Sequence, residues 1–563
     1  MTVTQVGWRF DEMRNAKSIN VAIDTPRCQD FINLLLRSFI LTFNKTYCIF
    51  KTIMKQNAAE PGFIMPAREW IKSVIERNKK SDNGFALDLE ILILKSALYI
   101  LSILENIVGR NLYIKQTTAE NETANIDPAI LTLAQNLIND GFLKYYYIQD
   151  GFPDEPKAIT VSAHFGNLIE KSDSARPEYS SSGVSGVDFA SYGKALMRCL
   201  GEAVERTCLG FYKKKDLIYA SFKELGDTAV NPKIFVNFSP TQLKDEKFLR
   251  CRFDENSRFG WTWGESLITG KKILVPAQLV YVPYKYEDKE PLIRRPISTG
   301  AAAYTNREEA LYRGVCETVE RDAFIIHYLN KISPPIIDLE NSQDKDLKKI
   351  HEEFKRYNLE LYVLDVTTDI PIPTFVTLII DRTGIGPAVS VSNKTDLNNK
   401  KAIIGSIEGC LKVRSWTRRE LLKKPDLAQI QQNVKNMFSL IDRCLFWTPV
   451  KMIKNIEFFT KGKKEPFVAS EAPPTSKERL QKALQYFLTN KLEVIAVDLA
   501  IPEAKKHGFH AFMVSIPKLQ PLYLDEKYPY YGGERLYNVP VKLGYFQSPK
   551  TEAKLNQIIQ PFA

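Results

Sequence analysis

Two segments of this 563-residue chain repeat one pattern of carboxylates. Residues 200–206 read LGEAVER and residues 315–321 read VCETVER, so each carries two glutamates three positions apart and then an arginine. Residues three apart share one face of a helix, and apolar residues recur at helical spacing in both segments. The sequence therefore predicts two helices that each present paired carboxylates. The four glutamates are Glu202, Glu205, Glu317 and Glu320.

The second segment has a further carboxylate upstream. Glu309 precedes Glu317 by eight positions, and at about 100° per residue it falls within about 80° of arc of both Glu317 and Glu320. Asn306 and Glu309 also form an N-x-x-E capping pattern, which predicts a helix start at Asn306. Glu309 thus has two candidate roles, helix capping or action with the other glutamates, and one side chain cannot serve both.

Facing stripes of carboxylates require a cation. Like charges on a helix destabilise it and raise each other's pKa, and Mg²⁺ prefers oxygen ligands and accompanies substrate phosphates. Arg206 and Arg321 could bind phosphate oxygens in a fork geometry. The pattern predicts a nucleoside triphosphate held through Mg²⁺ by helices, since no G-x-x-x-x-G-K-[ST] segment occurs. A single copy of this pattern could equally be a solvated helix surface. Two copies, each with the same spacing of apolar residues, favour a paired site.

The elements that must position these residues change character along the chain. Residues 1–126 have long apolar-periodic stretches typical of helices, and 117–125 is a polar boundary. From 127 onward, short β-rich runs alternate with helical segments, which predicts a mixed α/β (α+β) fold. We expect a helical region of unknown role at 1–126, a main domain at 127–550 and a tail at 551–563.

The expected strands are short and rich in β-formers. They are residues 158–162, 233–238, 272–281, 359–366, 375–380 and 493–498. Residues 172–186, rich in Ser and Gly, are expected to form a loop, and residues 517–533 an irregular, partly exposed segment.

Composition limits the class of protein. With 44% apolar and 25% charged residues the chain is not disordered, and its eight cysteines, none at C-x-x-C spacing, do not form a disulfide scaffold or favour a structural zinc site. The net charge of +11 is diffuse; it indicates a solvated basic surface or, alternatively, an anionic partner. The apolar stretches at 31–50 and 91–108 contain charges and favour core helices over membrane spans. We expect a cytoplasmic protein with neither a membrane nor a nucleic-acid partner.

Both motifs resemble signatures of the YcaO family. CLGEAVERTC at 199–208 is similar to its first helix, and STGAAAYTNREEALYRGVCETVERDAF at 298–324 is similar to its second block. The region 508–536 resembles the branch that makes thiazoles and oxazoles in ribosomally made peptides. The resemblance covers roughly residues 127–550.

The resemblance implies an ATP- and Mg²⁺-dependent enzyme. A Cys, Ser or Thr of a precursor peptide would attack the preceding carbonyl, the oxygen would take the γ-phosphoryl group of ATP, and loss of phosphate would leave an azoline ring. Glu202, Glu205, Glu317 and Glu320 would be the Mg²⁺ and phosphate-side ligands. Glu309 would belong to the nucleotide site and Arg321 would contact phosphate. Arg414, in a third family-like helix, would hold the triphosphate or be an ordinary surface residue.

The resemblance also implies partners and leaves alternatives open. A leader-binding partner similar to ubiquitin-activating (E1) enzymes and a homodimer are expected. The chain departs from the family pattern at Thr299, at Tyr304, at the lysine-free segment 183–186 and at its QPFA end, where the azoline branch often has a Pro-x-Pro-x-Pro tail that reaches the active site. The alternatives are a thioamide- or amidine-forming enzyme and a non-catalytic nucleotide-binding scaffold.

Overall fold

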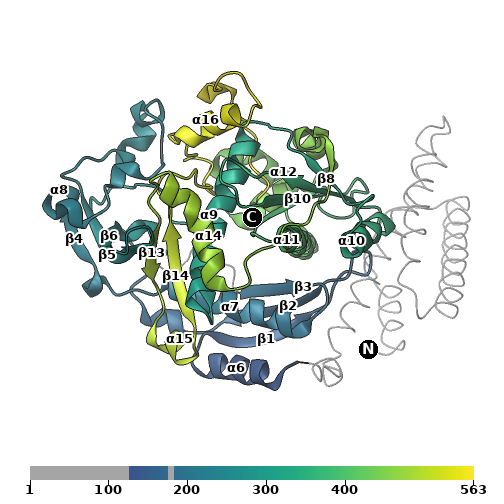
Figure 1. The fold of residues 1–563 in the computed structure, drawn as a ribbon, viewed down its shortest axis with the longest axis horizontal. Coiled ribbons are helices and arrows are strands. Elements are labelled where there is room, and N and C mark those ends of the chain that lie inside the picture. The colour runs from purple at the N-terminus through teal and green to yellow at the C-terminus, as the bar shows by residue number, and fades with distance from the viewer. Residues whose placement is uncertain (1–125, 175–182, 438, 563) are drawn as a thin grey trace, which may run out of the picture. The chain divides into compact units, whose positions relative to one another are not determined.

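The computed structural model describes residues 126–174, 183–437 and 439–562 (Figure 1). The chain divides into two units, residues 1–104 and 105–563, and every described residue belongs to the second. The helical region expected at 1–126 therefore lies outside the described residues, apart from residue 126 itself.

The described part is a mixed α+β fold, as predicted. Its α-helices are α6 (Pro128–Asn139), α7 (Tyr192–Gly210), α8 (Phe222–Leu225), α9 (Arg307–Leu329), α10 (Lys345–Arg356), α11 (Asn399–Leu421), α12 (Leu427–Gln432), α13 (Leu440–Phe446), α14 (Ser476–Thr489), α15 (Pro502–Lys506) and α16 (Glu534–Lys542). None of these helices combines the length and the apolar composition that crossing a bilayer requires.

The described strands form three sheets. The first has the order β1 (Leu143–Gln149), β2 (Ile159–Phe165), β3 (Gly183–Asp188). The second has the order β4 (Ile218–Ser221), β5 (Arg258–Ser266), β13 (Ile495–Asp498), β14 (His510–Ser515), β7 (Ala301–Tyr304), with β6 (Lys272–Pro276) paired to β5. The third has the order β11 (Val389–Thr395), β10 (Thr374–Ile380), β9 (Glu360–Asp365), β8 (Ile336–Asp338), β12 (Lys464–Pro466).

Both carboxylate motifs lie on long helices. The first lies in α7 and the second in α9. The predicted start of α9 is confirmed, because the Asn306 side chain accepts a hydrogen bond from the Glu309 N–H at 2.9 Å. In Figure 1, α9 runs through the centre of the fold, and it contacts β7 and β14 of the second sheet as well as β11 and β10 of the third.

α7 and α9 pack on opposite faces of the second sheet. Successive strand residues point to opposite faces. In β14, Ala511 and Met513 join the hydrophobic core of α7, whereas Phe512 and Val514 join that of α9. β7, at the described edge of this sheet, is only four residues long and reads AAAY. Side chains from the two helices can therefore meet only around the edge formed by β7, whose small alanines let both helices approach.

Three expected elements differ from the structure. The strand expected at 272–281 is wrong beyond Pro276, where β6 ends and a 3₁₀ turn covers Ala277–Leu279. The strand expected at 233–238 is wrong: a 3₁₀ turn covers Pro232–Ile234, and the Val236 N–H bonds to the Pro517 carbonyl rather than to a strand. The loop expected at 172–186 is wrong at its end, where β3 pairs with β2. Gly186 serves close packing there, because a Cβ atom would lie 2.0 Å from the Ala195 oxygen of α7.

The segment 517–533 is irregular, as predicted, but it is not mainly exposed. Tyr523 and Tyr530 are only 2% and 1% exposed. The Tyr530 hydroxyl accepts a hydrogen bond from the Arg295 N–H at 2.9 Å. Aromatic bodies with satisfied hydroxyls can be buried without regular structure, which the turn-rich composition did not indicate.

Gly300, just before β7, allows a test of this packing. It has φ +93°, and a Cβ atom there would lie 2.0 Å from the Val514 oxygen. We expect Gly300→Ala to lower the free energy of unfolding by about 3 kcal/mol, because backbone must move and the conformation is strained. Gly270→Ala is the matched control, with φ +71° and no atom within 4 Å; it should cost only about 1 kcal/mol. Urea unfolding measures both, and equal losses would contradict the packing argument.

Candidate functional site

The four predicted glutamates form one group, here called the glutamate cluster: Glu202 and Glu205 from α7, with Glu317 and Glu320 from α9. Their electrostatic coupling shows the convergence. Burial, together with the charges of Glu317 and Glu202, raises the pKa of Glu205 to about 8. Two helices on opposite faces of a sheet thus bring their carboxylates together around β7.

Basic side chains surround the cluster. Lys412 of α11 places Nζ 2.9 Å from Glu202 Oε2. Arg206 lies 3.8 Å from Glu202 and 3.4 Å from Glu205. Arg321 places Nη2 2.9 Å from Glu317 Oε1 and also bonds Glu320. Lys394 of β11 is close enough to oppose the rise in the pKa values of Glu205 and Glu320. The basic side chains are Arg206, Arg321, Lys394 and Lys412, so four basic groups accompany the four glutamates.

Backbone groups orient the α9 pair. The Gly300 N–H donates to Glu317 Oε2 at 3.0 Å, and the Thr395 N–H donates to Glu320 Oε2 at 2.8 Å. Asn393 accepts from Arg321 at 2.8 Å and donates to the Glu320 carbonyl at 3.1 Å. The Glu320 side chain is 4% exposed, whereas those of Glu205 and Glu317 are 20% and 23% exposed. The Glu202 side chain is 27% exposed. Solvent can therefore reach Glu202, Glu205 and Glu317, and Glu320 is an internal support.

The pKa shifts differ within the cluster. Burial alone would raise the pKa of Glu202, but Lys412 and Arg206 more than offset it and the pKa is lowered. Burial prevails at Glu320, whose pKa is raised despite Lys394 and Arg321. Glu205, with the pKa of about 8, is the carboxylate whose charge is least compensated. A further cation would be best accommodated beside it.

The donor set fits Mg²⁺ and phosphate, although the carboxylates are turned toward basic groups. Within the described parts of the chain, no three Asp, Glu, His or Cys side chains come together closely enough to hold a metal ion. Each glutamate instead faces an arginine or lysine. Carboxylate oxygens are suitable Mg²⁺ ligands, and guanidinium groups are suitable for phosphate. Direct coordination of Mg²⁺ by Glu202, Glu205, Glu317 and Glu320 stays a prediction.

Glu309 lies apart from the cluster. It is eight residues, hence about 12 Å of helix rise, before Glu317. Its carboxylate accepts from Arg313 at 2.9 Å, from Ser476 at 2.9 Å and from Arg479 at 2.6 Å. Burial raises its pKa, but Arg313 and Arg479 prevail and the pKa is lowered. The capping role is wrong, because the carboxylate joins α9 to α14 instead; its membership of the nucleotide site stays a prediction.

Arg414 is a buried structural residue. It is neither the triphosphate ligand nor the surface residue that the sequence led us to expect. Its side chain is 2% exposed. Its Nη2 lies 2.7 Å from Asp381, its Nε lies 2.8 Å from Glu155, and its Nη1 donates to the Pro387 carbonyl at 2.9 Å. All three nitrogens face the protein interior, so we remove Arg414 from the predicted triphosphate site.

Sequence reasoning missed several members of the site. Lys394, Asn393 and Lys412 lie on β11 and α11, and no local motif separates these lysines from the other basic residues of the chain. The Phe562 ring lies 4.3 Å from the Arg321 guanidinium, so the C-terminal segment reaches the cluster although it lacks the family's proline pattern. The Trp447 Nε1–H and the Tyr328 hydroxyl anchor this segment by donating to the Ile559 carbonyl at 3.1 and 2.9 Å.

Comparison with known proteins assigns the family. The sequence model described as YcaO cyclodehydratase, ATP- and Mg²⁺-binding, matches residues 189–520. The chain belongs to the YcaO family. This confirms the predicted family and the predicted cofactors, ATP and Mg²⁺.

Two curated relatives are uncharacterised. A protein from the tfuA 3′ region of Rhizobium leguminosarum bv. trifolii is 32% identical over 136 residues, which are 23% of this chain and 32% of the relative. One from Methanothermobacter thermautotrophicus is 25% identical over 155 residues, which are 27% and 40% of the two chains. The matches thus span about a third to two fifths of these relatives.

Solved structures share the fold. A heterocyclase in complex with substrate and cofactor has a TM-score of 0.62 at 23% identity, over 76% of this chain and 57% of that one. The heterocyclase TruD gives 0.50 at 23% identity, over 65% and 50%. YcaO from Methanopyrus kandleri, bound with AMPPCP and Mg²⁺, gives 0.51 at 15% identity, over 71% and 92%.

The structural role of Arg414 can be measured. We expect Arg414→Ala to lower the free energy of unfolding by roughly 3 kcal/mol, because it removes a buried partner from Asp381 and Glu155. Arg258→Ala is the control, since Arg258 forms an exposed pair with Glu224 at 3.0 Å and should contribute at most about 1 kcal/mol. Urea unfolding gives both values. Comparable small losses would show that the Arg414 pairs do not support the fold.

Glu205 should make stability depend on pH. Its pKa is about 8 in the folded chain against an ordinary value of 4.5, so the folded state binds more protons between these values. Stability should therefore fall as pH rises from about 5 to 8. We expect Glu205→Gln to flatten this slope, whereas Glu352→Gln on the exposed face of α10 should leave it in place. Unfolding free energies at several pH values measure the slopes, and an unaltered slope in Glu205→Gln would contradict the assignment.

Proposed function

We propose that this protein uses ATP and Mg²⁺ to phosphorylate a backbone amide oxygen of a ribosomally made precursor peptide and so forms azoline rings from Cys, Ser or Thr. One observation carries the proposal: carboxylates from α7 and α9 converge around β7 together with Arg206 and Arg321. This arrangement combines ligands for a divalent cation with ligands for a polyphosphate.

The two kinds of side chain have complementary roles. The three partly exposed carboxylates, Glu202, Glu205 and Glu317, would hold Mg²⁺. Arg206 and Arg321 turn from these carboxylates to phosphate oxygens, so the cluster exchanges internal ion pairs for pairs with the ligand. Glu320 and Asn393 hold Arg321 in place. Because four basic side chains accompany the four glutamates, Mg²⁺ and a triphosphate can replace the internal ion pairs with pairs to the ligand, so that the buried charges stay paired.

The chemistry requires positioning more than a protein nucleophile. An amide oxygen is a poor leaving group, and ATP, when bound with Mg²⁺, would supply the phosphoryl group that makes it a good one. The chain's own residues align the peptide carbonyl with the γ-phosphate, exclude water and neutralise the transferring charge. The attacking group is the side chain of the peptide itself.

The peptide, and an E1-like partner that binds its leader, are part of this proposal. Membership of the YcaO cyclodehydratase family supports a ring-forming dehydration. The test incubates the full chain with candidate peptide, partner, ATP and Mg²⁺ and reads the peptide mass. Loss of one water per ring supports azoline formation. Exchange of oxygen for sulfur would instead establish the thioamide alternative, and an unaltered peptide with no ATP turnover would favour a scaffold.

Glu317 allows a direct test of the ligand site. We expect Glu317→Gln to lower ATP turnover at least about 100-fold, because a neutral amide binds a divalent cation weakly and no longer pairs with Arg321. It should also weaken binding of Mg²⁺–AMPPCP, measured by calorimetry. Glu352→Gln is the matched control, and circular dichroism verifies folding. Unaltered turnover in a folded Glu317→Gln protein would remove this residue from the site.

A further inference from the structure

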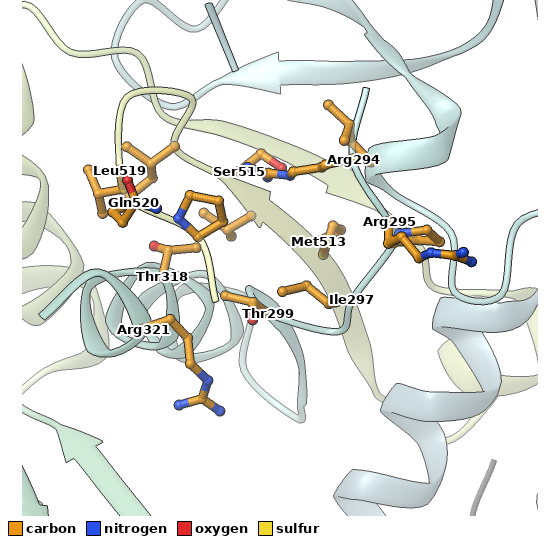
Figure 2. A pocket seen from close by; sticks show the side chains of 15 residues that line it. Arg294, Arg295, Ile297, Thr299, Thr318, Arg321, Met513, Ser515, Leu519 and Gln520 are labelled. Carbon is orange, nitrogen blue, oxygen red and sulfur yellow. The ribbon is translucent and has the colours of Figure 1, made fainter. Parts of the chain in front are cut away.

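A small solvent-open recess, with a cavity volume of about 30 Å³, lies next to the glutamate cluster. Residues 294–299, α9 and residues 513–521 form its walls. Figure 2 shows Arg294 and Ser515 on one side, with Thr299 and Arg321 on the other. The apolar part of the lining includes Leu279, Ile297, Met513, Ile516 and Leu519. The recess thus combines an apolar lining with a few polar groups, and it has room for a group of a few atoms.

Arg294 is the unusual member of this lining. Among the described residues, no carboxylate lies within ion-pair distance of it. Its Nη1 donates to the Val236 carbonyl at 3.3 Å, and its guanidinium lies 5.8 Å from the Phe235 ring. Burial lowers its pKa, which acidic neighbours would have raised.

The other two arginines of the recess are already compensated. Arg295 pairs with Asp525 at 2.8 Å, and Arg321 pairs with Glu317 and Glu320. One guanidinium charge is therefore left without an anion. A partly buried charge is costly unless it is paired, so a ligand that brings an anion would gain an ion pair without breaking one.

We propose that Arg294 binds a carboxylate of the peptide substrate in this recess, supplied by an acidic side chain or by a terminal carboxylate. The substrate's identity as a peptide rests on the proposed function. One free guanidinium matches a planar monoanion that accepts two parallel hydrogen bonds. A carboxylate group is small enough for this recess, and Thr299 and Ser515, which both carry hydroxyls, are among its lining residues.

The position of the recess gives this contact a purpose. Thr299 lines it, and the next residue, Gly300, donates its N–H to Glu317. Thr318 and Arg321 line it from α9, directly after Glu317 and Glu320. A carboxylate held here would fix the neighbouring peptide segment beside the phosphoryl-transfer site. Arg294 is thus a determinant of substrate specificity and orientation, distinct from the residues that hold ATP.

The first test needs no peptide. Phenylglyoxal modifies accessible guanidinium groups, and mass spectrometry gives the rate at each arginine of the full chain. We expect sodium acetate to slow modification of Arg294 about threefold or more by forming a charge-assisted pair, at constant ionic strength set with chloride. Arg258, which already pairs with Glu224, is the control and should be unaffected. No protection of Arg294, or equal protection by inorganic phosphate, would overturn the carboxylate assignment.

The second test uses a peptide that the enzyme converts. We expect Arg294→Gln to raise the KM for this peptide roughly tenfold, through the loss of one charge-assisted contact, with little loss of kcat. Arg294→Lys should raise the KM less than Arg294→Gln does. Arg258→Gln is the matched control. The effect should vanish with a C-terminally amidated peptide if the terminus is bound, or with Asp→Asn or Glu→Gln peptides if a side chain is bound. A KM effect that persists in all these peptides would overturn the proposal. If no peptide is converted, the proposed function fails, and the acetate experiment still decides the role of Arg294.

Discussion

The repulsion among four carboxylates is the constraint on which the rest of the site depends. Glu205 has its pKa raised to about 8 by burial and by its neighbours Glu317 and Glu202. Such a group can be kept together only if cations alternate with the carboxylates. The cations come from α7 and α9, which carry Arg206 and Arg321, and from β11 and α11, which carry Lys394 and Lys412. A site built this way is ready to exchange its internal pairs for a cation and an anion that arrive together.

The sheet that separates α7 from α9 determines where this exchange can occur. The two helices pack on opposite faces of this sheet, so their glutamates meet only around the short edge strand β7. Its alanines and the closely packed Gly300 keep the gap narrow, and the Gly300 N–H orients Glu317. Small side chains in the STGAAAY segment therefore matter as much as the charged ones.

A second buried network holds the surroundings of the site in place. Asp322, directly after Arg321, is fully buried and accepts hydrogen bonds from the Gln520 N–H at 2.7 Å and from Arg535 at 2.9 and 2.7 Å. Arg535 also pairs with Asp369 at 2.8 Å. These contacts join α9 to α16 and to residues 513–521, which form one wall of the recess that Arg294 also lines. Phe562 on Arg321 adds the C-terminal segment to the same assembly.

The sequence by itself determined the chemistry that is local to a helix. Spacing of three residues put Glu202 beside Glu205 and Glu317 beside Glu320, and the N-x-x-E pattern located the start of α9 at Asn306, because helical geometry is set by near neighbours along the chain. The mixed fold and five of the fourteen described strands, namely β2, β6, β9, β10 and β13, followed from short-range periodicity in the same way. Only the tertiary structure decided what lies between distant segments. It turned Glu309 toward Arg479, buried Arg414 against Asp381, and brought Lys394, Lys412 and Phe562 to the cluster. Among the residues that the structure describes, it left Arg294 without an acidic partner. Charge pairing and burial depend on residues hundreds of positions apart, and no periodicity within a segment records which of them will meet.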